Sequence, residues 1–146
     1  MAKKEQTART VVLGATPVSM LWDKLLLLPI VGTIDSRRAQ ELTETMLKKI
    51  DQEKASVIIL DIRGVPAIDS AVANHLIKIT KATRLMGCEC IICGISAAVA
   101  QTMVSLGVDL HDIVTIAALK DALTTALGKL GFRIVENPQS TAPLAG

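Results

Sequence analysis

Two apolar runs, residues 56–62 and 88–95, constrain the fold of this chain more than any other feature. The first reads SVIILDI and the second CECIICGI, and both are nearly continuous stretches of hydrophobic side chains. A strand with one wet face alternates apolar and polar residues, whereas a strand buried on both faces has this continuous composition. The two runs therefore predict central strands of a sheet that is covered on both sides.

Hydrophobic spacing predicts helices between these strands. The pattern indicates helices at 35–50, 69–86, 97–107 and 118–130, and further strands at 18–21, 25–31 and 113–116. The polar pair Asp23 and Lys24 separates the first two strands and predicts a hairpin, and Gly87 stands where a helix often ends. Strands that alternate with helices are typical of βαβ units. We expect a single α/β domain whose mixed, mostly parallel sheet packs against helices.

The charge and aromatic content argue against nucleic acid as a partner. The 146 residues carry 16 basic and 14 acidic side chains, a net charge of +2, with one Trp, one Phe and no Tyr. Proteins that bind nucleic acid usually present a basic face and rings on which bases stack. This chain has neither.

No stretch of the sequence resembles a membrane anchor or a signal peptide. The longest apolar stretch, 25–32, is much shorter than the roughly 20 residues of a membrane-spanning helix. The N-terminal lysines are not followed by an apolar core. We therefore expect a cytoplasmic protein without a membrane partner, with a tail at 1–16, one domain at 17–132 and a second tail at 133–146.

Catalytic motifs are incomplete in this sequence. The stretch LGKLG at 127–131 lacks the first glycine and the hydroxyl of a phosphate-binding loop. Ser96, in GISAA, lacks the second glycine of a nucleophile elbow. We expect no enzymatic activity and no cofactor.

The cysteines and histidines do not form a metal-binding pattern. On a strand, Cys88 and Cys90 point to one face and Cys93 to the other, and no second CxxC pair completes four zinc ligands. We expect three reduced, buried thiols and no metal. His75 and His111 are isolated and are expected to be structural or surface groups.

Asp69 and Ser70 follow the loop GVPAI and begin a predicted helix. As local chemistry, Asp69 is a good N-cap and Ser70 an ordinary first-turn residue. A serine at this place is also exposed to a kinase at the edge of the sheet where ligands collect. Phosphate there would add about −1.5 to −2 charges at the positive end of the helix dipole, which the fold tolerates. A partner packed on it would lose several kcal/mol, roughly, by burying an unpaired charge, so both interpretations stay open at this point.

Asp61 supports a competing hypothesis. It lies near the end of a central strand, where receiver domains carry a phosphorylated aspartate. Such a site also needs an acidic pair that binds magnesium and a lysine from another strand end. The strands here end in VGTID and CGIS, which supply neither.

Three longer stretches combine these motifs: LPIVGTIDSRRAQEL, VIILDIRGVPAIDSAVANHLIKITKATRLMGCECIICGI and AAVAQTMVSLGVDL. They resemble the STAS domain family of anti-sigma-factor antagonists, and most closely the scaffold proteins of the bacterial stressosome. The likeness covers roughly 17–130. It includes the D-S pair in its loop, the LMG that ends the helix, and the hydroxyl in AQT.

The resemblance implies a non-catalytic phosphoprotein. In the family a serine kinase of the GHKL type modifies the position that matches Ser70, with Asp69 supporting the loop, and a phosphatase reverses the modification. A second family site matches Thr102. The unphosphorylated scaffold sequesters the kinase in a large assembly, so the implied partners are this kinase, the phosphatase, further copies of the chain and a sensor-bearing STAS paralogue.

Two scaffold types share the domain. Serine at position 70 resembles the type without a sensor domain, whereas LPIVGTIDSRRAQ resembles the sensor-bearing type. A simple antagonist that binds its kinase one to one, without a large particle, is the alternative function.

Overall fold

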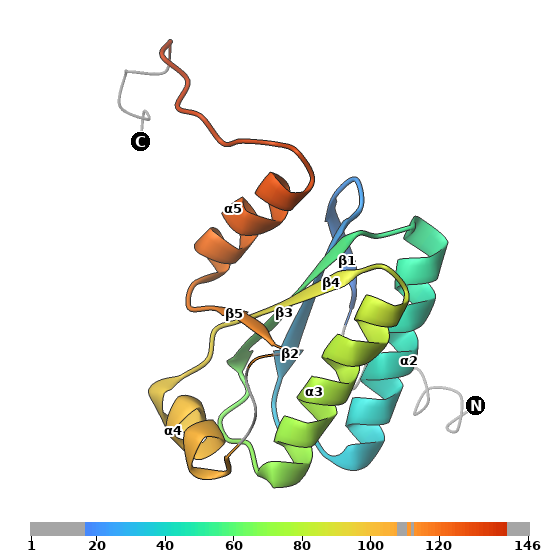
Figure 1. Ribbon diagram of the computed structural model, residues 1–146, viewed down its shortest axis with the longest axis vertical. Coiled ribbons are helices and arrows are strands. Elements are labelled where there is room, and N and C mark those ends of the chain that lie inside the picture. The colour runs from blue at the N-terminus through green and yellow to red at the C-terminus, as the bar shows by residue number, and fades with distance from the viewer. Residues whose placement is uncertain (1–16, 108–110, 112, 140–146) are drawn as a thin grey trace, which may run out of the picture.

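A five-stranded sheet forms the centre of the protein in the computed structural model, which describes residues 17–107, 111 and 113–139 (Figure 1). The strands are β1 (Ser19–Trp22), β2 (Leu25–Val31), β3 (Val57–Gly64), β4 (Glu89–Cys93) and β5 (Val114–Ile116). The helices are α2 (Ser36–Glu53), α3 (Ser70–Leu85), α4 (Ala97–Ser105) and α5 (Leu119–Lys129). The predicted tail at 1–16 lies outside the described residues, and 133–139 contain neither helix nor strand.

The strands lie in the sheet in the order of the sequence. β1 pairs with β2 antiparallel, and β2, β3, β4 and β5 pair in parallel. The predicted hairpin and the mostly parallel α/β fold are therefore confirmed. Each parallel connection runs through a helix, so α2, α3 and α4 all begin at the edge of the sheet where the parallel strands end.

The predicted strand at 25–31 coincides with β2, and the boundaries of the other elements differ from the observed ones by at most three residues. β1 lies one residue later than predicted, because Trp22 still pairs with Leu25 across the turn. β3 continues to Gly64, which pairs with Val31. α2 continues to Glu53 through polar residues that carry no apolar periodicity. The next residue, Lys54, is the C-cap and adopts the left-handed conformation (φ 52°).

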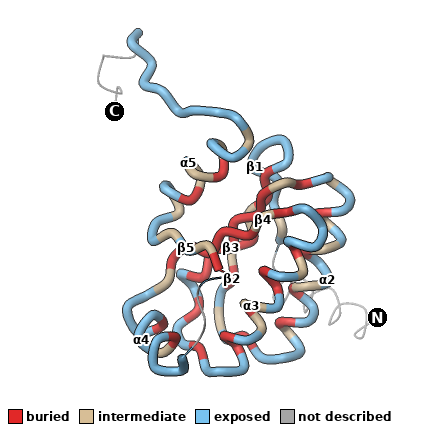
Figure 2. The backbone as a smooth tube through the Cα atoms, viewed as in Figure 1, coloured by how far each residue is buried: buried red, intermediate tan, exposed pale blue. Residues whose placement is uncertain are grey.

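Strands β3 and β4 are buried on both faces, as the two apolar runs predict (Figure 2). On one face, alternate residues of β2, β3 and β4 pack against α2, α3 and α4. The strands contribute Leu26, Leu28, Ile30, Ile58, Leu60, Ile62 and Ile92, and the helices contribute Met46, Ile50 and Leu76. On the other face, α5 packs its Ala122 and Ala126 against Ile59 and Ile91. An ion pair of 3.0 Å between Lys129 Nζ and Glu89 Oε1 joins the end of α5 to β4. The described helices include none with the length and apolarity that crossing a bilayer requires.

The three cysteines are reduced and buried, and they divide between the two faces as predicted. Cys88 and Cys90 lie in the cluster beneath α2 and α3, and Cys93 lies beneath α5. Burial raises the pKa of Cys88 and of Cys90 to about 12, and that of Cys93 to about 11, from an ordinary value of 9.0. The folded protein therefore keeps these thiols protonated at a pH where the unfolded chain has lost the protons.

This difference predicts a loss of stability in alkaline solution. The raised thiol pKa values contribute stability below pH 9, and this contribution falls as the pH rises from 9 towards the folded values. Each thiol that is ionised only in the unfolded chain lowers the free energy of unfolding by about 1.4 kcal/mol per pH unit. Urea unfolding at pH 8 and pH 10 measures the fall, and Cys93→Ala should reduce its slope. An unfolding free energy independent of pH over this range would contradict the prediction.

Candidate functional site at the start of helix α3

The loop after β3 holds Asp69 and Ser70 in a fixed place on the surface. Two apolar side chains of the loop, Val65 and Ile68, are buried in the core beside α2 and α3. Between and after them the backbone comes to the surface, where Asp69 and Ser70 are both exposed. The loop is thus anchored from below while the serine stays accessible.

Asp69 is the N-cap of α3, as predicted. Its backbone is extended (φ −111°, ψ −175°), and its Oδ1 accepts a hydrogen bond of 2.9 Å from the backbone N–H of Val72. This bond satisfies one of the free N–H groups of the first turn, and the carboxylate lies at the positive end of the helix dipole. Ser70 is the first residue of the helix, and its hydroxyl has no hydrogen-bond partner among the described residues.

The same local structure occurs a second time at the start of α2, and sequence reasoning missed it. Ile34, Asp35 and Ser36 repeat the I-D-S of 68–70, and Asp35 Oδ1 accepts a bond of 2.8 Å from the N–H of Arg38. The Asp35 backbone (φ −104°, ψ 178°) matches that of Asp69. The repeat of the tripeptide I-D-S in the sequence could have revealed this second cap. Cap geometry alone therefore does not distinguish Ser70 from Ser36.

His75 connects the two helix starts. Its Nε2 lies 3.2 Å from the Oγ of Ser36, so the second turn of α3 contacts the first residue of α2. The expectation that His75 is a hydrogen-bonded structural group is confirmed. His111 lies in the turn between α4 and β5. Within the described ranges, no three His, Cys, Asp or Glu side chains come together as metal ligands.

Thr102 lies on α4, and its hydroxyl is bonded to the helix backbone. Thr102 Oγ1 donates a hydrogen bond of 3.0 Å to the carbonyl of Ala98, one turn earlier. The side chain is only partly exposed. Ser96 caps the same helix by accepting a bond of 3.1 Å from the N–H of Val99. Modification of Thr102 would first require its hydroxyl to leave the helix backbone.

Asp61 is engaged by Arg63 in a close ion pair. Arg63 Nε lies 3.0 Å from each carboxylate oxygen, Nη2 lies 2.7 Å from Oδ2, and the Arg63 backbone N–H donates to Oδ1 at 3.1 Å. The hydrogen bond and the charge of Asp61 raise the pKa of Arg63. Asp61 is buried, and both of its oxygens are occupied. This geometry disfavours the receiver hypothesis, because a phosphoryl group would have to displace the arginine.

Gly94 makes room for this ion pair. Its backbone is left-handed (φ 79°), and a Cβ atom there would overlap Arg63 Cγ and lie 2.8 Å from Asp61 Oδ1. Sequence reasoning did not connect Asp61, Arg63 and Gly94. The contact joins the end of β3 to the residue after β4.

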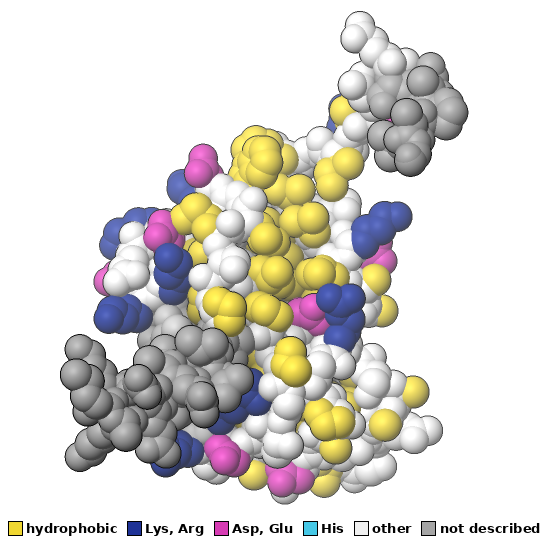
Figure 3. Space-filling model, turned by 180° about the vertical axis from the view of Figure 1, so that it is seen from behind, with side chains coloured by type: hydrophobic (Ala, Val, Ile, Leu, Met, Phe, Trp, Pro, Cys, Tyr) yellow, Lys and Arg dark blue, Asp and Glu magenta, His cyan; other side chains and the backbone are white. Residues whose placement is uncertain are grey.

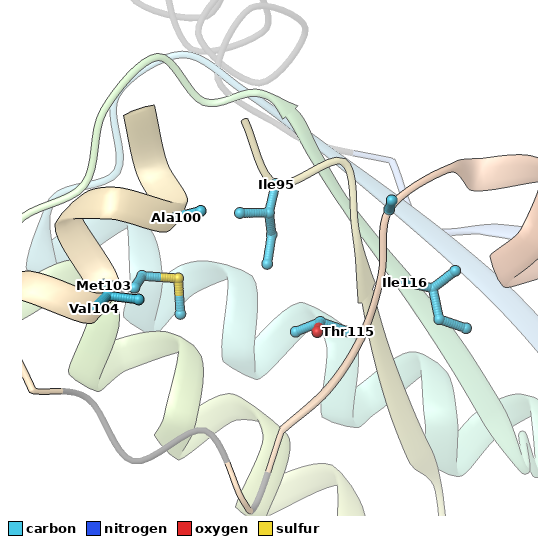
Figure 4. Close-up of a pocket in the computed structure, with 7 residues that line it drawn as sticks. Ile95, Ala100, Met103, Val104, Thr115 and Ile116 are labelled. Atoms are coloured by element: carbon cyan, nitrogen blue, oxygen red, sulfur yellow. The ribbon is translucent and has the colours of Figure 1, made fainter. Parts of the chain in front are cut away.

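A small cavity lies between α4 and β5 (Figure 4). It measures about 280 Å³, and its lining residues are Ile95, Ala100, Met103, Val104, Thr115, Ile116 and Ala117. The Thr115 hydroxyl is the single polar side-chain group of this lining. Binding sites for polar substrates combine several convergent polar groups, so this cavity does not have the lining of such a site.

The fold and the site together define an α/β domain that presents a capped serine at one edge of a mostly parallel sheet. The sequence profile of the STAS domain matches residues 17–129. The RsbT co-antagonist protein RsbRA of Bacillus subtilis (strain 168) is 36% identical over 121 residues, which is 83% of this chain and 44% of the relative. The chain thus spans less than half of that relative. It belongs to the STAS domain family.

Solved structures share the fold. RsbS of Moorella thermoacetica, as a serine-to-glutamate variant, superposes with a TM-score of 0.69 at 24% identity over 81% of this chain and 99% of that one. A chain of the stressosome, described as a signal integration and transduction hub, gives 0.63 at 24% identity over 80% of this chain and 100% of that one. The predicted STAS fold is therefore confirmed.

The N-cap bond predicts a measurable loss of stability. Asp69→Ala removes the acceptor for the Val72 N–H, and the free energy of unfolding should fall by about 1 kcal/mol. Asp35→Ala removes the matched cap of α2 and should cost a similar amount. Asp69→Asn keeps an acceptor and should cost less. Urea unfolding of the three variants tests this, and an Asp69→Ala variant as stable as the wild type contradicts the bond.

Gly94 offers a second stability test. Gly94→Ala should destabilise the protein by at least 2 kcal/mol, roughly, because the new methyl group meets Asp61 and Arg63 in addition to the backbone strain. Gly87→Ala is the matched control, since Gly87 has nearly the same φ (78°) and open space around it. The expected cost there is only the strain of about 1 to 2 kcal/mol. Thermal or urea unfolding measures both losses of stability. Equal losses for Gly94→Ala and Gly87→Ala would show that Asp61 and Arg63 move aside for the new methyl group at no cost.

Proposed function

We propose that this chain is a non-catalytic scaffold of a stressosome-like assembly, switched by phosphorylation of Ser70. In its unphosphorylated form it binds and sequesters a serine kinase of the GHKL type. Transfer of phosphate to Ser70 releases the kinase, and a phosphatase restores the binding form. Because this kinase uses ATP, the proposal places the protein in the cytoplasm.

The main support for this proposal is the exposed Ser70 at the start of a capped and anchored helix. Val65 and Ile68 fix the loop from the core, Asp69 closes the first turn, and the serine hydroxyl is left to solvent. A kinase reaches such a hydroxyl without unfolding the helix. Asp69 is a positioning residue here and not a base, because its Oδ1 is already occupied by the Val72 N–H.

The physical effect of the phosphate would be confined to the surface. The group adds about −1.5 to −2 charges beside Asp69, at the end of α3 where the helix dipole favours negative charge. The fold therefore remains intact. A partner packed against Ser70 would have to bury that charge without a counter-ion, and a loss of about 1.4 kcal/mol already weakens binding tenfold.

The relatives support the assembly part of the proposal. One is named a co-antagonist of RsbT, and one structural neighbour is a chain of the stressosome. We propose that this chain assembles with further copies of itself and with a sensor-bearing STAS paralogue. The experiment below tests whether the chain forms the particle alone or only together with the paralogue.

A simple antagonist that binds its kinase one to one is the second candidate. Sedimentation with and without the sensor-bearing paralogue separates the two functions. A megadalton species supports the scaffold, and a persistent small species supports the simple antagonist.

Phosphorylation itself is tested by intact-mass spectrometry after incubation with the cognate kinase and Mg-ATP. We expect one phosphate on the wild type that is lost in Ser70→Ala. Ser36→Ala is the matched control, because it removes a serine from the same I-D-S cap geometry. Thr102→Ala tests the second family site, whose hydroxyl is held by Ala98.

The outcomes are distinct. Full modification of Ser70→Ala would overturn the assignment, and the two other variants would then show whether Ser36 or Thr102 is the acceptor. A second phosphate that disappears in Thr102→Ala would establish the second site. Acid-labile phosphate, in contrast to acid-stable phosphoserine, would indicate Asp61 and the receiver hypothesis.

A further inference from the structure

One part of the sheet lacks a covering helix. α5 packs against β3, β4 and β5, and on the same face its cluster buries Leu25 and partly buries Leu27, whereas the rest of β2 and all of β1 have no helix over them. We call this part the open face, and its residues are Trp22, Leu27, Pro29, Val31 and Phe132. Trp22 is 52% exposed, Val31 67% and Phe132 50%. Seen from behind, hydrophobic side chains gather across this side of the molecule (Figure 3).

Alternation along β2 explains why these residues share a face. Leu26, Leu28 and Ile30 point into the core beneath α2 and α3, so Leu27 and Val31 point to the other side. Trp22 is paired with Leu25 in the hairpin and lies on the same side. Parallel sheets normally have both faces covered. Contiguous exposed apolar surface of this kind marks an interaction site.

A second exposed apolar segment follows α5. Residues 131–139, which we call the arm, leave the domain after Phe132 and extend beyond it (Figure 1). Ile134 is 59% exposed and Val135 66%. The arm is anchored where it starts, because the Phe132 ring meets the Trp22 ring edge-on at 5.8 Å. A groove of about 510 Å³ at this place is lined by Met20, Leu21, Trp22, Asp23 and Phe132.

We propose that the open face binds a second copy of this chain, and that each arm lies across the open face of the other copy. Ile134 and Val135 would supply the apolar side chains that cover the open face and enter its groove. The inference rests on the assembly part of the proposed function, to which it adds a surface. It is independent of the Ser70 switch.

Charge favours a second copy over a charged partner. In a two-fold symmetric dimer, each side chain near the axis faces the same side chain of the other copy. A charged side chain there would face its own charge, so a symmetric contact needs an uncharged surface near the axis. The five residues of the open face are uncharged, and the groove beside them has one charged lining residue, Asp23. The charged neighbour of the open face on β3, Arg63, is neutralised by Asp61 at 2.7 Å.

Size explains why the arm is needed. A strip two strands wide and as long as the seven residues of β2 measures roughly 10 by 23 Å. This is well below the roughly 800 Å² per partner that stable complexes bury. Two arms, each contributing its own apolar residues, enlarge the contact in both copies.

The edge of the sheet is a less suitable contact than its face. β1 is the edge strand on the side of the open face, and its pairing with β2 shifts register between Met20 and Trp22. Such a bulge twists an edge strand away from further pairing. The second copy therefore lies on the face, and the sheet does not continue from one copy into the next.

Sedimentation of the full chain tests the proposal by measuring its mass in solution at different concentrations. Protein concentrations from about 1 µM to about 1 mM cover the dissociation constants that a contact of this size would have. We expect the 15.5 kDa chain to associate as its concentration rises. Val31→Lys and Ile134→Lys should each raise the dissociation constant at least tenfold, since each places like charges in the contact. Val104→Lys is the matched control, because Val104 is 71% exposed but lies on α4. Circular dichroism establishes that each variant is folded.

Three results would overturn the inference. They are a wild type that stays monomeric throughout, association unchanged in both Val31→Lys and Ile134→Lys, and equal weakening by Val104→Lys. Kinase-dependent phosphorylation of the Val31→Lys variant separates the two proposals. If Ser70 is modified while association is unaffected, the open-face inference fails and the phosphorylation switch stands.

Discussion

Burial of β3 and β4 on both faces is the constraint on which the rest of the structure depends. A strand with apolar side chains on both sides requires a layer of helices above and below the sheet. The chain meets this requirement by returning through a helix after each parallel strand and by crossing to the other face only with α5. The positions of the helix starts, and thus of the exposed serines, follow from that arrangement.

The parallel connections gather three helix starts at one edge of the sheet. α2, α3 and α4 each begin with a side-chain cap, from Asp35, Asp69 and Ser96. This edge therefore combines exposed hydroxyl groups with the positive ends of helix dipoles. Ser70 differs from Ser36 in its neighbours and not in its backbone, because the Ser36 hydroxyl lies against His75. Selectivity between them must come from the surface that surrounds each serine.

Most of the fold was predictable from the sequence because it rests on short periodic patterns. Alternation along β2, the apolar runs of β3 and β4, and the cap of α3 each depend on neighbouring residues only. The ion pair of Asp61 with Arg63 and its fit to Gly94 joins residues about 30 positions apart, and no local pattern reports such a contact. The bond of the Thr102 hydroxyl to Ala98 depends on the side-chain rotamer, which no sequence pattern reports.

The open face was missed for a different reason. Whether Leu27 and Val31 are covered depends on how much of the sheet α5 can shield, and one helix covers roughly 10 Å of width. Sequence periodicity identifies which side of a strand is apolar. It does not tell how many strands a single helix spans.

The contact between Trp22 and Phe132 gives the protein an intrinsic optical label. Trp22 is the single tryptophan of the chain and there is no tyrosine, so near-ultraviolet fluorescence arises from one ring. That ring lies at the end of the sheet where β2 starts, whereas Ser70 follows the opposite end of β3. The emission wavelength of Trp22 therefore reports the exposure of the start of β2 to water. A charge at the start of α3 leaves this wavelength largely unchanged. Two events at opposite ends of one small domain thus have separate spectroscopic readouts.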